Sequence, residues 1–169
     1  MRRVLVGLLI GFALSLAPTF VDRAEAQTFR LGGHGLYSSG TLTGDFGLGA
    51  RIGVGIPFLP VELQGIYDYR FPDCPRGYSG CSGWTGVLNV VLSSGDTGFY
   101  VGGGTSFFRE DNPPDEGEGG LVVVEDWGLD LVLGVIFDLL PVVHPFGEVR
   151  YEWYDDVDSR LVLSVGLIL

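Results

Sequence analysis

The two cysteines of the chain, Cys74 and Cys81, stand close together in the segment CPRGYSGC. In an exported protein, an even number of closely spaced cysteines favours a disulfide. Structural zinc takes four ligands, so two thiolates alone do not predict a metal site. The sequence therefore predicts a disulfide that staples one loop, with two free thiols as the alternative.

The two histidines, His34 and His144, are the candidates for acid–base chemistry. Ser38 and Ser39 follow His34, and a Ser–His–acid arrangement would support nucleophilic catalysis. No local motif surrounds these serines, so we expect no enzymatic activity and interpret His34 as an interior residue hydrogen-bonded to an acid. The glycines repeat with the period of a strand and precede no helix, so the sequence predicts no phosphate-binding loop and no cofactor.

Acidic residues gather in two segments, REDNPPDEGEGG and a later one near residue 156. They are Glu110, Asp111, Asp115, Glu116, Glu118, Asp155, Asp156 and Asp158. Their spacing fits no defined calcium-binding loop. We therefore expect solvated loops and no metal site.

The elements that must position these residues are strands. In GDFGLGARIGVGIP, from Gly44 to Pro57, every second residue is apolar, and the positions between are glycine apart from Asp45 and Arg51. A period of two predicts a strand with one apolar face. That face would line the core of a soluble protein, but it would meet lipid in a membrane barrel.

Residues 1–26 have the pattern of a cleaved signal peptide, which leaves 27–169 as one domain. Arg2 and Arg3 precede an apolar run that is too short to span a membrane as a helix, and a small-x-small site ends at Ala26. The remaining chain would carry seven arginines, no lysine and 19 acids, a net charge of −12. This balance argues against a nucleic-acid partner and against binding to anionic lipid through a basic surface.

Alternation and turn signals predict eight strands in the mature chain. They are expected at about 28–38, 44–56, 61–71, 84–93, 98–108, 126–138, 145–154 and 160–169. Most approach the roughly 9–11 residues that cross a bilayer at a tilt. The connections at 57–60, 93–96 and 139–145 are short, whereas those at 72–83 and 110–125 are long and polar. If both termini lie in the periplasm, the short turns share that side and the long loops face outward.

Aromatic residues are expected to form two belts, one at each end of the strands, as at a membrane interface. The outer belt would contain Tyr37, Phe46, Tyr69, Phe71, Trp84, Phe107, Trp127, Trp153 and Tyr154, and the opposite belt Phe29, Phe99, Phe137 and Phe146.

The less apolar faces of the strands predict a charged interior. An eight-stranded barrel has an interior that side chains can fill, and buried charges must be paired because an uncompensated one is costly. The expected network comprises Arg30, Arg51, Arg70, Arg150, Arg160, Asp45, Glu62, Asp68, Asp130, Glu148 and Glu152, together with the polar residues Gln64 and Asn89. Gly47, Gly49, Gly53, Gly55, Gly102, Gly104 and Gly134 would leave room for these side chains.

The segments HPFGEVRYEWYDD (144–156), SRLVLSVGLIL (159–169) and GFYVGGGTSF (98–107) resemble the small outer-membrane β-barrel family that includes the outer membrane protein A transmembrane domain and outer membrane protein X. The resemblance covers nearly all of 27–169. It implies an all-β, eight-stranded antiparallel up-and-down transmembrane barrel in a Gram-negative outer membrane. The family usually ends on an aromatic residue that helps the barrel assembly machinery to recognise the last strand, whereas Leu169 stands here.

Three functions remain open at this stage. The first is a structural or surface-interaction protein with a narrow, salt-bridged lumen, in contact with outer-membrane lipid and lipopolysaccharide and with an extracellular or envelope partner through its acidic loops. In that case the acids could also hold divalent cations that bridge to lipopolysaccharide phosphates. The second is a narrow porin-like ion channel, and the third is a soluble lipocalin-like barrel that binds a small apolar ligand.

Overall fold

The computed structural model describes residues 29–39, 45–72, 81–93, 98–112, 122–139 and 142–169. The predicted signal peptide, Cys74 and most of the residues of the predicted loops lie outside these ranges. Within them, no helix is long and apolar enough to span a membrane.

Eight antiparallel strands form a closed barrel in which each strand pairs with the next and β8 pairs with β1. The strands are β1 (Phe29–Ser39), β2 (Asp45–Gly55), β3 (Val61–Phe71), β4 (Ser82–Ser93), β5 (Gly98–Asn112), β6 (Val122–Ile136), β7 (His144–Tyr154) and β8 (Arg160–Ile168). The prediction of an all-β, eight-stranded up-and-down barrel is therefore confirmed.

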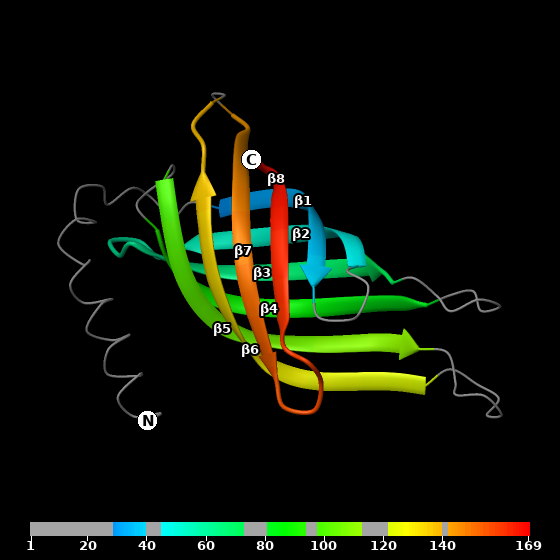
Figure 1. The fold of residues 1–169 in the computed structure, drawn as a ribbon. Coiled ribbons are helices and arrows are strands. Elements are labelled where there is room, and N and C mark those ends of the chain that lie inside the picture. Colours follow the sequence, from blue (N-terminus) through cyan, green and yellow to red (C-terminus); the bar gives the residue numbers. More distant parts are fainter. Residues whose placement is uncertain (1–28, 40–44, 73–80, 94–97, 113–121, 140–141) are drawn as a thin grey trace.

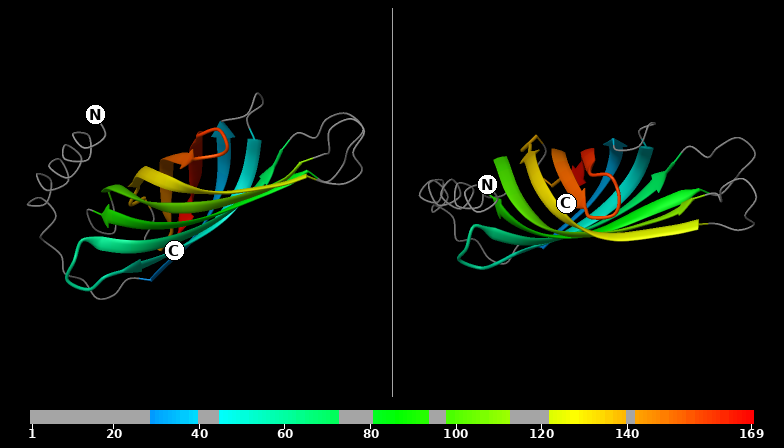
Figure 2. Two further views of the ribbon diagram at one scale, coloured as in Figure 1. Left: turned by 90° about the horizontal axis from the view of Figure 1, so that it is seen from below. Right: turned by 60° about the horizontal axis from the view of Figure 1, so that its bottom comes forward.

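The pairing of β1 with β8 forms the seam that closes the barrel, and the two longest strands, β5 and β6, curve to bring these strands together. In Figure 1, β7 and β8 cross in front of β2 to β4, and β5 and β6 curve from one group to the other. Figure 2 shows the same curvature from two other directions. At the seam, the backbone N–H of Leu169 donates to the carbonyl of Leu31 at 2.8 Å. Strand tilt and coiling of this kind are what closure of a sheet into a barrel requires.

The two ends of the barrel differ in their connections. The end that holds residues 56–60, 137–139 and 142–143 is called the turn end, and the end that holds residues 155–159 is called the loop end. At the turn end, Ile56 N–H donates to the Val61 carbonyl at 2.8 Å, and Phe58 adopts a positive φ of 67° within that tight reversal. Phe137 N–H donates to the Pro145 carbonyl at 2.8 Å in the second turn.

Two strands are longer than the sequence indicated. β5 continues to Asn112 and β6 begins at Val122, whereas the predicted limits were 108 and 126. An outward ion pair supports the extension, because Arg109 on β5 stands opposite Glu125 on β6 and their side chains meet at 2.8 Å. The acidic composition there indicated a loop, but cross-strand pairing keeps the segment in the sheet.

The alternation predicted for each strand separates an apolar outer face from a polar inner one. In β2, Phe46, Leu48 and Ile52 are exposed, while Asp45 and Arg51 are buried. A small apolar cluster lies inside near the turn end and contains Val91, Tyr100, Val132, Ile136, Phe146 and Ile168. The rest of the interior is largely hydrogen-bonded and charged, and we refer to the interior as a whole as the lumen.

Candidate functional site: the polar lumen

Glycines make the space that the lumen side chains occupy. A Cβ atom at Gly49 would collide with the imidazole of His34 and the carboxylate of Asp68. A Cβ at Gly134 would collide with the ring of Tyr100, and one at Gly104 with the amide of Asn89. The glycine-rich face of each strand therefore admits large polar groups from its neighbours.

A group of three residues from three strands lies in the lumen on the turn-end side. Both guanidinium Nη atoms of Arg51 donate to Glu148, at 2.9 and 2.8 Å. The hydroxyl of Tyr100 donates to the same carboxylate at 2.6 Å. The guanidinium of Arg51 also lies over the ring of Phe146, 3.9 Å from its centre. This bidentate, aromatic-backed geometry suits arginine and would not be reproduced by lysine.

Arg150 connects this group to the opposite wall. Its guanidinium is fully buried, forms an ion pair with Asp68, and lies 3.3 Å from Glu148 and 3.5 Å from Glu152. Asp68 in turn meets Nε2 of His34 at 2.8 Å. One arginine thus contacts three acids, and a continuous chain of polar contacts runs from β1 to β7.

The network continues toward both ends. At the turn end, Arg30 forms an ion pair with Glu62 at 2.7 Å. Toward the loop end, Arg160 donates to Glu110 at 3.4 Å and lies over the ring of Phe108, 3.8 Å from its centre. Arg70 donates to Thr85, and the Tyr154 hydroxyl donates to Glu152 at 2.9 Å. Ion pairs and rings therefore fill the lumen along its length.

The structure places all eleven members of the expected charge network on inward faces. Ten of them are buried, namely Asp45, Arg51, Glu62, Asp68, Arg70, Asp130, Glu148, Arg150, Glu152 and Arg160, and the eleventh, Arg30, is largely covered beside Glu62. Glu110 joins them, although the sequence suggested a solvated loop there. Its position, two residues after inward Phe108, is the signal that could have revealed it.

Tyr100 and Phe108 are also lumen residues that the sequence analysis missed. Two aromatic assignments were wrong. Phe146 and Tyr154 were expected in the belts, but both are buried inside. Phe146 supports Arg51, and Tyr154 is hydrogen-bonded to Glu152.

The remaining aromatic residues of the two belts face outward. On the loop-end side, Tyr67, Trp84, Phe107 and Trp127 form a row in which neighbouring ring centres lie 5.9, 5.4 and 4.9 Å apart. Tyr37 contacts Phe46, Tyr69 contacts Phe71, and Trp153 contacts Tyr151. Phe29, Phe99 and Phe137 are exposed toward the turn end.

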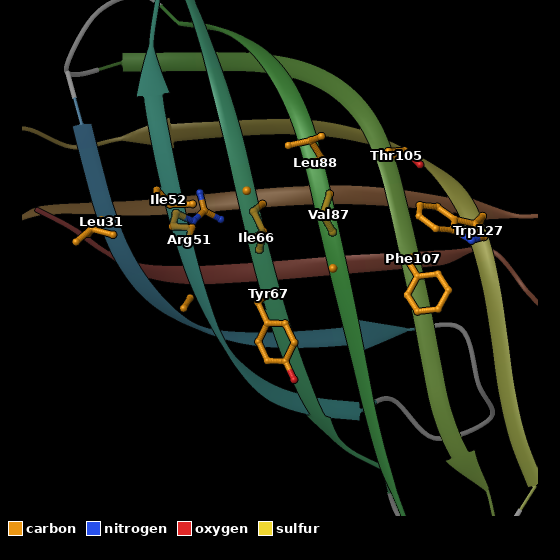
Figure 3. Close-up of a pocket in the computed structure, with 13 residues that line it drawn as sticks. Leu31, Arg51, Ile52, Ile66, Tyr67, Val87, Leu88, Thr105, Phe107 and Trp127 are labelled. Carbon is orange, nitrogen blue, oxygen red and sulfur yellow. The ribbon is translucent and has the colours of Figure 1, made fainter. Parts of the chain in front are cut away.

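A groove of about 590 Å³ crosses the outer face of β1 to β6. It is lined by the small residues Ala50, Gly65, Gly86 and Thr105. Larger side chains that line it include Ile52, Leu88, Tyr67, Phe107 and Trp127 (Figure 3). The lining is almost entirely apolar, and no set of polar groups converges on it as in a catalytic pocket. The apolar lining of the groove suits hydrocarbon groups rather than a polar substrate.

The candidate residues for chemistry are separated in the fold. His34 contacts Asp68, while the hydroxyl of Ser39 donates to the Leu161 carbonyl at 3.4 Å. His144 lies at the turn end, 3.7 Å from Asp138. Among the described residues, no group of three or more His, Cys, Asp or Glu side chains is arranged to hold a metal ion. The cysteine pair remains a prediction, because Cys74 falls outside the described ranges.

Comparison with known proteins identifies the fold. No family model matches the chain, and no curated protein matches it significantly in sequence. Neisserial surface protein A is 17% identical, with a TM-score of 0.61 over 86% of this chain and 99% of that one. The N-terminal barrel of Pseudomonas aeruginosa OprF is 12% identical, with a TM-score of 0.59 over 85% and 100%. Ail, the attachment invasion locus protein of Yersinia pestis, crystallised with the heparin analogue sucrose octasulfate, is 12% identical, with a TM-score of 0.55 over 85% and 97%. The chain therefore has the fold of the small eight-stranded outer-membrane β-barrels.

Proposed function

We propose that the protein is an integral outer-membrane β-barrel with both termini in the periplasm, and that it has a structural or surface-interaction role through its acidic loop end. The observation that carries this proposal is the inversion of polarity between its faces. Apolar residues and aromatic belts cover the outside, whereas ion pairs and hydrogen-bonded polar groups occupy much of the inside. Lipid is the environment in which that arrangement is stable.

The same inversion weighs against a lipocalin-like function. A barrel that encloses a small apolar ligand needs an apolar interior. Here Arg150, Asp68 and Glu148 occupy the middle of the lumen and are almost completely buried. An apolar ligand in their place would leave charges unpaired in a medium of low dielectric constant.

The continuous network also favours a closed lumen over an open pore. Arg51 and Glu148 meet at 2.8 Å, and Arg150 links Glu148 to Asp68 on the opposite wall. A narrow channel is the second candidate function, because ion pairs can exchange partners where one arginine contacts several acids, as Arg150 does. Conduction would require these contacts to separate.

The loop end supports an interaction role through its charge. Asp155, Asp156 and Asp158 are exposed in the β7–β8 connection. Ail was crystallised with a sulfated sugar, but three exposed aspartates would repel such a polyanion here. We propose a cationic partner, or divalent cations that bridge to lipopolysaccharide phosphates.

One pair of measurements tests the proposal. The full chain is extracted from outer-membrane fractions, and its gel mobility is compared before and after boiling. A folded barrel should resist detergent when cold and shift on boiling. Purified protein is then placed in a planar bilayer, where a closed lumen should give little conductance. Recovery in the soluble fraction without a shift would refute the membrane assignment, and stable ion-conducting steps would favour the channel.

A further inference from the structure

Asp130 is a buried acid of the central lumen that forms no ion pair with any arginine among the described residues. It is 1% exposed, and its Oδ2 accepts a hydrogen bond from the amide nitrogen of Asn89 at 2.6 Å. Its Oδ1 has no hydrogen-bond partner, and no ion pair joins Asp130 to an arginine in the part of the chain that the structure describes. A carboxylate in this position requires a compensating charge from elsewhere.

Of the neighbouring residues, Arg150 acts on Asp130 with its positive charge, but no ion pair joins the two in the described part of the chain. The pairing partner of Asp130 on β7 is Glu152, another acid. Arg150 is already in contact with Asp68, Glu148 and Glu152. With Arg70, which lies near Glu152, the central lumen sets Asp68, Asp130, Glu148 and Glu152 against Arg51, Arg70 and Arg150, so the acids outnumber the arginines by one.

Unused oxygen atoms gather on the same side of the lumen. The side-chain oxygens of Asn89 and Gln64 are buried and have no hydrogen-bond partner. Gln64 and Asn89 are opposite each other on β3 and β4, so their side chains are neighbours on the inner face. Gly104 separates Asn89 from Asp130 in the pairing register and leaves the space through which the two side chains meet.

We propose that Asp130, Asn89 and Gln64 form a binding site for one alkali-metal cation, Na⁺ or K⁺, inside the lumen. Oxygen atoms are the ligands that hard cations prefer. One carboxylate with two neutral amide oxygens matches a single positive charge, whereas calcium sites generally recruit several carboxylates. This inference stands apart from the role of the loop end and from the question of conduction, because it depends on the lumen side chains alone.

The first test uses the folded full chain in detergent micelles. The midpoint of thermal unfolding is measured while NaCl or KCl replaces choline chloride at constant ionic strength. A ligand that binds the folded state raises the midpoint as its concentration exceeds the dissociation constant. We expect a saturable increase for the wild type and none for Asp130→Asn, which retains the shape of the side chain but removes its charge.

Two further variants make the test specific. Glu125→Gln removes an outward acid from the same strand and should keep the full response to the cation. Gln64→Leu removes one oxygen and should raise the half-saturating concentration several-fold. It also provides the comparison if Asp130→Asn fails to fold. The site would be overturned if the wild type had the same unfolding midpoint in NaCl or KCl as in choline chloride. It would also be overturned if Asp130→Asn showed the same increase in midpoint as the wild type.

A direct observation distinguishes a metal ion from a proton. In crystals soaked with a thallium(I) salt, the anomalous signal should show a peak beside the Asp130 carboxylate in the wild type. Asp130→Asn, or Gln64→Leu if the first variant does not fold, should lose or weaken that peak. If Asp130 is instead protonated, the peak will be absent and the unfolding midpoint will respond to pH but not to the cation, which would overturn the proposal.

Discussion

The guanidinium of Arg150 forms an ion pair with Asp68 across the full width of the lumen. Arg150 belongs to β7 and Asp68 to β3, and these strands lie on opposite sides of the eight-stranded ring. The contact therefore braces two walls that no backbone hydrogen bond connects. Both side chains are almost completely buried, which makes their mutual dependence strong.

Removing the basic partner of this brace should strongly destabilise the barrel. We expect Arg150→Leu to lower the free energy of unfolding by about 3–5 kcal/mol, because Asp68, Glu148 and Glu152 lose their shared cation. Urea unfolding of the barrel in micelles measures the effect. The double variant with Asp68→Asn should recover part of the loss, since one uncompensated charge is removed. Wild-type stability together with unchanged conductance in Arg150→Leu would mean that the inward face is assigned wrongly.

Space, rather than backbone freedom, explains the lumen glycines. Gly49→Ala should destabilise the barrel by about 1–3 kcal/mol, because the added methyl group collides with His34 and Asp68. Gly35→Ala and Gly147→Ala are matched controls, since a Cβ at either position meets nothing within 4 Å. Thermal or denaturant unfolding should give a lower midpoint for Gly49→Ala than for Gly35→Ala and Gly147→Ala. Three equal midpoints would contradict the packing described for His34.

The cost of a charge on the outer face should depend on its distance from the barrel ends. Leu131 lies near the middle of β6 and faces outward, so Leu131→Arg should cost about 2–4 kcal/mol in a bilayer. Val123 faces outward near the loop end, and Val123→Arg should cost about 0–1 kcal/mol. Folding into lipid vesicles, followed by denaturant titration, gives both values. Equal costs would indicate that the outer face does not meet hydrocarbon.

The cysteine pair gives a prediction that chemistry can test directly. We expect Cys74 and Cys81 to resist alkylation in the native protein and to react fully after reduction, with the matching mass shift in each of the two tryptic peptides that cleavage after Arg76 separates. An intact disulfide leaves no thiol to alkylate, so the reaction should require a reductant. Rapid alkylation without a reductant would identify two free thiols.

Strand positions could be predicted closely because apolar residues recur at every second position on the outer faces, while most charged residues and many glycines stand at the positions between. The alternation from Asp45 to Gly55 shows this pattern, and β2 covers the same residues. The prediction failed at the end of β5, where the sequence becomes acidic and typical of a loop before the strand ends. Glu110 is surrounded by residues typical of a loop, yet the pairing of β5 with β6 continues past it to Asn112 and Val122.

Whether an aromatic side chain faces inward or outward was predicted better by its position in the inward–outward alternation of the strand than by its closeness to the strand end. Phe146 shares its face with Glu148 and Arg150, so counting by twos places it inside, and the structure does the same. Tyr154 likewise shares its face with Glu152. Their closeness to the barrel ends suggested belts, but the belts contain outward residues such as Trp127 and Trp153.

The partners of the charged residues could not be derived from sequence spacing. Arg51 binds Glu148, 97 positions away, and Arg160 binds Glu110, 50 positions away. Which side chains share a level of the lumen depends on the tilt and stagger of the strands, and these are properties of the closed sheet. Sequence alternation therefore identified which charges lie inside but not which of them meet.

The seam between β1 and β8 also has a consequence for how the barrel folds. Leu31 and Leu169 exchange backbone hydrogen bonds although almost the whole barrel separates them along the chain. Contacts between such distant positions form slowly, because the loop they close has a high entropic cost. Until they form, both strands expose rows of unpaired amide and carbonyl groups, which hydrocarbon cannot solvate. We therefore expect closure to be coupled to insertion, and a chain lacking β8 to aggregate rather than form a smaller barrel.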